Sequence, residues 1–93
     1  MPWFRCFIRG ENFPLELDGK RQATGFYTTR YVEAADEGDA ELKAVNVLRD
    51  DPALKVPPGT PGVEHAMVYV EEIELVDGPS APNAGFTFFV EGT

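Results

Sequence analysis

The chain has 93 residues, of which 43% are hydrophobic, and its 8 basic and 16 acidic side chains give a net charge of −8. A chain of this length closes one shallow core, so we expect a single domain over residues 1–93. The acidity argues against general binding to nucleic acids or anionic membranes, because both need lysine and arginine to neutralise phosphate. One Trp, three Tyr and seven Phe exclude intrinsic disorder.

Residues 3–9 alternate between two faces in steps of two, which predicts a strand. One face carries Phe4, Cys6 and Ile8, which suit a buried core. The other face is mixed aromatic and cationic, with Trp3, Arg5, Phe7 and Arg9. The arginines also interrupt any apolar run, so we expect no signal peptide and a cytoplasmic location.

Residues 11–24 are rich in turn-forming residues and predict a long hairpin connection, with a short extra strand at residues 15–17. The tight turn is expected at Asp18-Gly19. Residues 25–34 are dense in aromatic and β-branched side chains, which predicts the second strand.

The next segment changes its period and predicts a helix that begins after Asp36 and ends near Pro52. Asp36 suits the N-cap, because its carboxylate can accept a free backbone N–H of the first turn. The apolar stripe, which we expect to pack on a sheet, consists of Ala40, Ala44, Val47 and Leu48.

Residues 52–63 are too rich in proline and glycine for a helix or a central strand, and they indicate a connector or, alternatively, a polyproline recognition segment. Residues 66–76 predict a third strand. A β-bulge at Glu71-Glu72 would bring its apolar residues onto one inner face. These residues are Ala66, Val68, Val70, Ile73 and Leu75. After a loop over residues 77–85, residues 86–90 predict a last strand.

The element order predicts an α+β fold, a two-layer β-β-α-β-β sandwich with one helix on one face of the sheet. The four-stranded sheet is expected to be antiparallel or mixed, with strand order 2-1-3-4. We expect a core that joins the helix stripe to Phe4, Cys6, Ile8, Val32, Ala34, Val68 and Val70.

One helix cannot cover four strands, and nothing is left for the other face of the sheet. Alternation places aromatic and arginine side chains on that face, namely Trp3, Arg5, Phe7, Arg9, Tyr27, Thr29, Tyr31, Tyr69 and Phe89. Uncovered aromatic patches of this kind are typical of interfaces. The first hypothesis is therefore a small non-enzymatic interaction module that homodimerises through this face or binds another protein with it.

Charge distribution supports two alternatives. Residues 1–30 carry five basic and three acidic side chains, whereas residues 31–93 carry three basic and thirteen acidic ones. The acidic part suits an inhibitor or antitoxin-like protein that binds a basic partner. The basic part suits a small anionic ligand held by Arg5, Arg9 and Arg30 beside Tyr27. Nucleic acid is a weaker candidate, because the local excess of positive charge is small.

The sequence offers no carrier for catalysis and no cofactor motif. Cys6 is expected in the core, and the lone His65 is expected far from it, so a reactive Cys–His pair is not predicted. One cysteine and one histidine cannot form a disulfide or a zinc site, and no metal site is predicted. The acidic series Glu71, Glu72, Glu74 and Asp77 is interpreted as solvent-facing charge or as charge that discourages pairing at the edge of the sheet.

Two strings, WFRCFIRGENF at residues 3–13 and GFYTTRYVEA at residues 25–34, resemble those of a group of short bacterial proteins of unknown function. This resemblance covers most of the chain and implies no activity. The corner at residues 31–36, followed by alanines four apart, is also similar to strand-to-helix corners in ferredoxin-like and HicB-like antitoxin domains. That similarity concerns the fold rather than the function.

Overall fold

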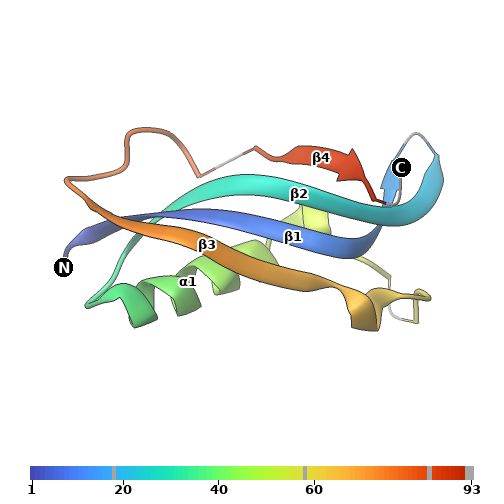
Figure 1. Cartoon of the computed structure of the whole chain (residues 1–93), viewed down its shortest axis with the longest axis horizontal. Helices are drawn as coiled ribbons and strands as arrows, with labels where there is room; N and C mark the ends of the chain where they lie inside the picture. Colours follow the sequence, from blue (N-terminus) through green and yellow to red (C-terminus); the bar gives the residue numbers. More distant parts are fainter. Residues whose placement is uncertain (18, 58, 84, 92–93) are drawn as a thin grey trace.

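The computed structural model describes residues 1–17, 19–57, 59–83 and 85–91. In chain order the elements are β1 (Trp3–Leu17), β2 (Lys20–Glu33), α1 (Glu37–Arg49), the 3-10 turns η1 (Pro52–Leu54) and η2 (Val63–His65), β3 (Met67–Val76) and β4 (Thr87–Val90). The strands form one sheet, and α1 lies along one of its faces (Figure 1). The predicted α+β architecture is confirmed.

The strand order is β3-β1-β2-β4, and all neighbouring strands are antiparallel. β1 lies between β2 and β3 as expected, but the order 2-1-3-4 is wrong for the last strand. β4 pairs with the far edge of β2, from Tyr27↔Thr87 to Thr24↔Val90, and not with β3. The physical reason is aromatic packing, because Phe86 and Phe88 both contact the buried ring of Phe26 on β2.

β1 and β2 form one long hairpin, so the predicted connection over residues 11–24 is wrong and the extra strand at 15–17 belongs to β1. A register shift between Gly10 and Phe13 absorbs the irregular sequence, with Asn12 at a positive φ of 59°. Pro14 is tolerated because it pairs with Ala23, whose carbonyl is directed away from β1 and accepts from the Glu91 N–H. Gly19, at φ 80°, supports the predicted turn, and Asp18 lies outside the described residues.

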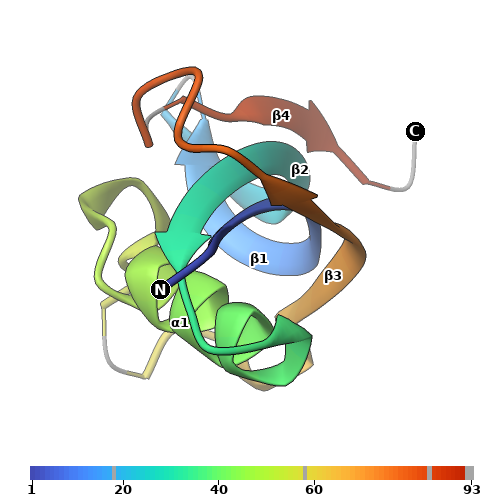
Figure 2. The same cartoon turned by 90° about the vertical axis from the view of Figure 1, so that its left-hand side faces the viewer.

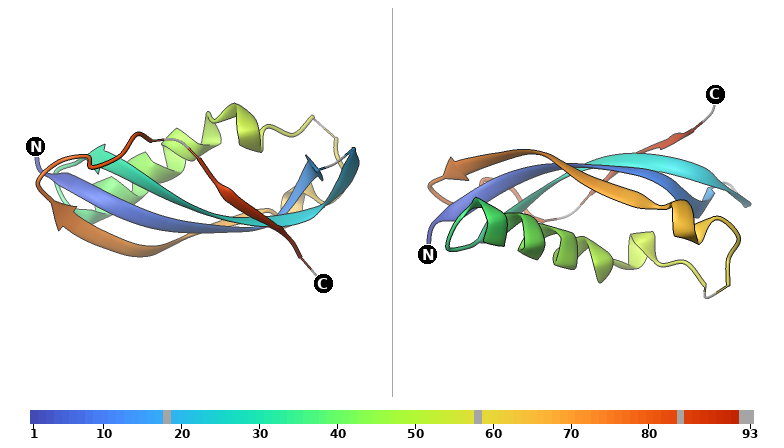
Figure 3. Two further views of the ribbon diagram at one scale, coloured as in Figure 1. Left: turned by 90° about the horizontal axis from the view of Figure 1, so that it is seen from above. Right: turned by 60° about the horizontal axis from the view of Figure 1, so that its bottom comes forward.

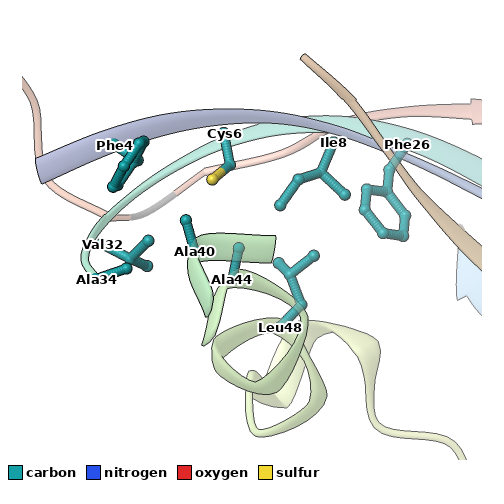
Figure 4. Close-up of a cluster of buried hydrophobic side chains, with 9 residues drawn as sticks. All are labelled: Phe4, Cys6, Ile8, Phe26, Val32, Ala34, Ala40, Ala44 and Leu48. Carbon is teal, nitrogen blue, oxygen red and sulfur yellow. The ribbon is translucent and has the colours of Figure 1, made fainter. Parts of the chain in front are cut away.

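α1 begins as predicted, since the Asp36 carboxylate accepts from the Asp39 N–H at 2.8 Å. Ala40, Ala44 and Leu48 are buried against the sheet (Figure 4). Val47 was expected in this stripe but is 40% exposed, because it is rotated by about 100° from Leu48 around the helix.

The core lies between α1 and the inner face of β1 and β2. The predicted bulge is confirmed, because the β1 to β3 register shifts between Phe7↔Glu72 and Ile8↔Val70. Val68 and Val70 are only half-buried, however, and Leu75 is 66% exposed, since they lie on the edge strand β3. The buried cluster consists of Phe4, Cys6, Ile8, Phe26, Val32, Ala34, Ala40, Ala44 and Leu48.

Figure 2 shows α1 on one side of the sheet only, and in Figure 3 β4 diverges from the side where α1 lies. α1 contacts β1, β2 and β3. The other face of the sheet and the β4 edge are therefore the surfaces that the helix leaves uncovered.

Candidate functional site

The face of the sheet opposite α1, called here the open face, is built by the odd-numbered residues of β2 and by the odd-numbered residues of β1 that precede the register shift after Gly10. The register pairs Arg5 with Tyr31, Phe7 with Thr29 and Arg9 with Tyr27. Directly opposed residues in a sheet point to the same side, so the alternation predicted from sequence places these side chains on one face.

An aromatic row crosses the open face over three strands. The rings of Phe7 and Tyr27 are stacked, with centroids 5.6 Å apart and planes 6° from parallel. Tyr27 in turn contacts Phe89 of β4 at 5.5 Å. Tyr27 and Phe89 are 39% and 36% exposed. The row therefore presents apolar ring surface to solvent, where contact with a partner would bury it.

Arg5 lies beside this row and is paired with carboxylates of β3. Its Nε donates to Glu74 Oε1 at 3.3 Å, and its Nη2 lies 3.8 Å from Glu72 Oε1. In the register Glu74 lies opposite Arg5 and Glu72 opposite Phe7, so both glutamates lie on the open face. Interpreting these glutamates as merely solvent-facing missed their pairing with arginine.

Arg9 lies in a tighter network at the hairpin side of the row. Its Nε donates to Glu71 and its Nη1 to Glu11, both at 2.7 Å, and its Cζ lies 4.5 Å from the Tyr69 ring centroid. Tyr69 also donates to Glu11 at 3.1 Å. The hydrogen bond from Arg9 lowers the pKa of Glu11, and the hydrogen bond from the Tyr69 hydroxyl lowers it further. The bond between Tyr69 and Glu11 in turn raises the pKa of Tyr69.

Tyr31 was expected on the exposed part of the open face, but it is buried beneath the part of the loop after β3 that carries Ser80 and Asn83. Its hydroxyl lies 2.6 Å from Ser80 Oγ. The Asn83 side chain accepts from the Tyr31 backbone N–H and donates to its carbonyl, both at 2.7 Å. Asn83 thus imitates a neighbouring strand. Trp3 lies beside the same loop and lines a shallow hollow with Pro79.

Arg30 lies on the opposite face of the sheet from Arg5 and Arg9, so these residues do not form one anion site. The Arg30 side chain is fully buried. Its Nη1 donates to Thr28 Oγ1 at 2.7 Å and to the Thr29 carbonyl at 3.1 Å, and its Nη2 lies 3.4 Å from Asp51.

The buried guanidinium of Arg30 also holds the end of the loop before β4. Its Cζ lies 4.8 Å from the Phe86 ring centroid, and Nη1 reaches the Gly85 carbonyl at 3.4 Å. Thr28 Oγ1 donates to the same carbonyl at 2.7 Å. Arg30 is therefore a structural cation that joins β2, η1 and the approach to β4.

A hollow of about 560 Å³ lies between the aromatic row and the loop. Among the described residues that line this hollow, Arg5 is the charged one. Its lining includes Arg5, Phe7, Tyr27, Thr29, Tyr31 and Pro82. A larger hollow of about 690 Å³ lies at the hairpin end, beside Pro14, Arg21, His65 and Met67, where none of the predicted site residues is found.

Cys6 and His65 do not form a reactive pair. Cys6 is fully buried in the core, and this burial raises the pKa of its thiol. His65 is exposed and lies 3.6 Å from its neighbour Glu64. Within residues 1–17, 19–57, 59–83 and 85–91, no group of three or more His, Cys, Asp or Glu side chains is arranged to hold a metal ion.

Comparison with protein-family models, with curated proteins and with solved structures found no match. In the part of the chain that the structure describes, no helix has the length and apolar character needed to cross a membrane.

Proposed function

We propose that this protein is a small non-enzymatic interaction module in which two copies pair through the open face. The observation that supports this is the row of Phe7, Tyr27 and Phe89, which crosses three strands on a face that α1 does not cover. Burial of such ring surface against a partner is favourable, at roughly 25 cal/mol per Å² of apolar area.

The charges beside the row favour a second copy over an anionic ligand. Arg5 and Arg9 already have carboxylate partners on β3 or β1, so an anion would have to displace those partners. Rows of arginine on β1 and of glutamate on β3 lie next to each other. A two-fold axis then allows the arginines of one copy to face the glutamates of the other.

The absence of catalysis is part of the same proposal. The thiol of Cys6 is in the core and the imidazole of His65 is on a remote turn, so neither activates the other. The single free cysteine also fits a reducing compartment, and on that ground we propose a cytoplasmic location.

A basic protein partner is the second candidate. Two arginines on the open face, Arg5 and Arg9, stand against four carboxylates, those of Glu11, Glu71, Glu72 and Glu74. The remaining negative charge would attract such a partner and make its binding sensitive to salt.

The test is a sedimentation comparison of the wild type with Tyr27→Glu and Leu42→Glu. Tyr27 lies in the aromatic row, whereas Leu42 is 62% exposed on α1 and serves as the matched control. We expect the wild type to sediment with a mass that is a multiple of the chain mass of 10.3 kDa. Tyr27→Glu should have half the mass of the wild type, and Leu42→Glu should have the same mass as the wild type. A wild type that stays monomeric at micromolar concentration contradicts pairing of two copies.

A further inference from the structure

The two edges of the sheet differ in how readily each could pair with an additional strand. The β3 edge carries a bulge and the carboxylates of Glu71, Glu72 and Glu74, features that discourage pairing with another chain. The β4 edge, residues Thr87–Val90, has the sequence TFFV and no charge. A charged, bulged edge beside an uncharged one suggests that the second edge is used.

The backbone of β2 shows which groups of β4 point outward. The N–H and C=O of Tyr31 face Asn83, and the Ala23 carbonyl accepts from Glu91 N, so the odd-numbered residues of β2 are directed toward the β4 side. In antiparallel pairing, backbone direction alternates along a strand.

Two register pairs, Gly25↔Phe89 and Tyr27↔Thr87, therefore exchange ladder hydrogen bonds. The N–H and C=O of the intervening Phe88 point away from β2. Phe88 thus offers one outward donor and one outward acceptor at the middle of an uncharged strand, which is the arrangement that strand addition requires.

We propose that β4 pairs antiparallel with β4 of a second copy, on a two-fold axis that passes next to Phe88. This inference rests on the proposed self-association and names an additional place where copies meet. The axis lets the outward N–H and C=O of Phe88 bond to the same groups of the partner's Phe88. The Phe88 side chains, each 37% exposed, then lie directly opposite each other as an aromatic cross-strand pair.

Self-pairing suits this edge better than the β3 edge on grounds of charge. At β4 the axis places Phe88 opposite Phe88 and Thr87 opposite Phe89, so no like charges meet there. At β3 it would bring glutamates against glutamates. Pairing at β4 also places both open faces on the same side of one continuous sheet, so the two aromatic rows adjoin at Phe89.

The test adds Phe88→Lys and Leu75→Lys to the sedimentation comparison. Lysine at an edge opposes strand addition. Because this change also removes the contact of Phe88 with Phe26, protection of the Phe89 N–H in the variant checks that the β2 to β4 ladder remains. Leu75, 66% exposed on β3, is the matched control. We expect Phe88→Lys to halve the mass, Leu75→Lys to leave it unchanged, and the double variant Tyr27→Glu/Phe88→Lys to sediment at the chain mass of 10.3 kDa.

Amide hydrogen exchange in the wild type gives a second readout that needs no variant. The Phe88 N–H should be protected at high protein concentration and should exchange at least tenfold faster on dilution to monomer. The N–H of Phe89, which faces β2, should change less.

The outcomes separate the two proposals. If Phe88→Lys keeps the wild-type mass while Tyr27→Glu halves it, edge pairing is overturned and the open face stands. If Tyr27→Glu keeps the wild-type mass while Phe88→Lys is monomeric, pairing through β4 is supported and pairing through the open face is overturned. A monomeric wild type overturns both.

Discussion

The two faces of the sheet both carry arginine, in opposite surroundings. On the helix face, Arg30 is fully buried among Thr28, Asp51 and Phe86. On the open face, the side chains of Arg5 and Arg9 are 28% and 29% exposed and pair with carboxylates at the surface. A shift of one position along a strand thus decides whether an arginine is buried against the core or lies on the open face.

The largest expected effect comes from Arg30→Ala. The change removes the donors that hold Thr28, the Thr29 carbonyl and Asp51 and leaves a cavity, so we expect a loss of about 3 kcal/mol in the free energy of unfolding. Arg5→Ala is the matched control on the open face, with an expected loss of about 0.5 kcal/mol. Urea unfolding measures both, and equal losses would contradict the contrast between the faces.

A glycine beneath an aromatic ring occurs on each face. A Cβ at Gly10 would lie 2.0 Å from the Phe26 ring, and one at Gly25 would lie 2.3 Å from the Phe89 ring. Phe26 is fully buried and cannot move, whereas Phe89 is 36% exposed. We expect Gly10→Ala to cost about 2 to 3 kcal/mol and Gly25→Ala about 1 kcal/mol.

Thermal unfolding measures this difference, and Gly78→Ala is the control because nothing lies within 4 Å of its Cβ position. A larger loss for Gly25→Ala than for Gly10→Ala would show that the open face is the more tightly packed one.

Asn83→Ala tests the loop that covers part of the open face. The change removes the two bonds to the Tyr31 backbone, and we expect a loss of about 1 to 2 kcal/mol. Asn46→Ala, on the exposed side of α1, should stabilise the protein by a few tenths of a kcal/mol, roughly, because alanine favours helix. Trp3 lies beside this loop, so its fluorescence should also shift in Asn83→Ala but not in Asn46→Ala.

The smallest effect concerns pH. The pKa of Glu11 lies below its ordinary value of 4.5 in the folded protein, so its stabilising contribution is present above that value and is lost as pH falls through the folded pKa. We expect the melting temperature of Glu11→Gln to be lower than that of the wild type at pH 7. The two melting temperatures should converge in acid, and a constant gap at all pH values would rule out this linkage.

Local patterns predicted much of the fold. Two-residue alternation identified the strands, the Asp36 cap and the spacing of Ala40 and Ala44 identified α1, and the phase change at Glu71-Glu72 identified the bulge. The position of β4 escaped prediction, because it depends on contacts of Phe86 and Phe88 with Phe26, about sixty residues away in the chain.

The site was predicted only in outline. Alternation placed Arg5, Phe7 and Tyr27 on one face, but it could not show that β3 carboxylates pair with the arginines, since that requires the register between strands. The even position of Arg30 was a signal that it lies on the other face. Burial of Tyr31 under Ser80 and Asn83 depends on the path of a loop, for which the sequence has no periodic signal.

The attachment of β4 has a consequence for local unfolding. β4 pairs with β2 through four residue pairs, while α1 packs on the other three strands. Opening of β4 therefore leaves the layer formed by α1 and β1 to β3 intact and costs less than global unfolding. Such opening exposes the edge of β2, and we expect it to become more frequent with any change that loosens Phe86 or Phe88 from Phe26.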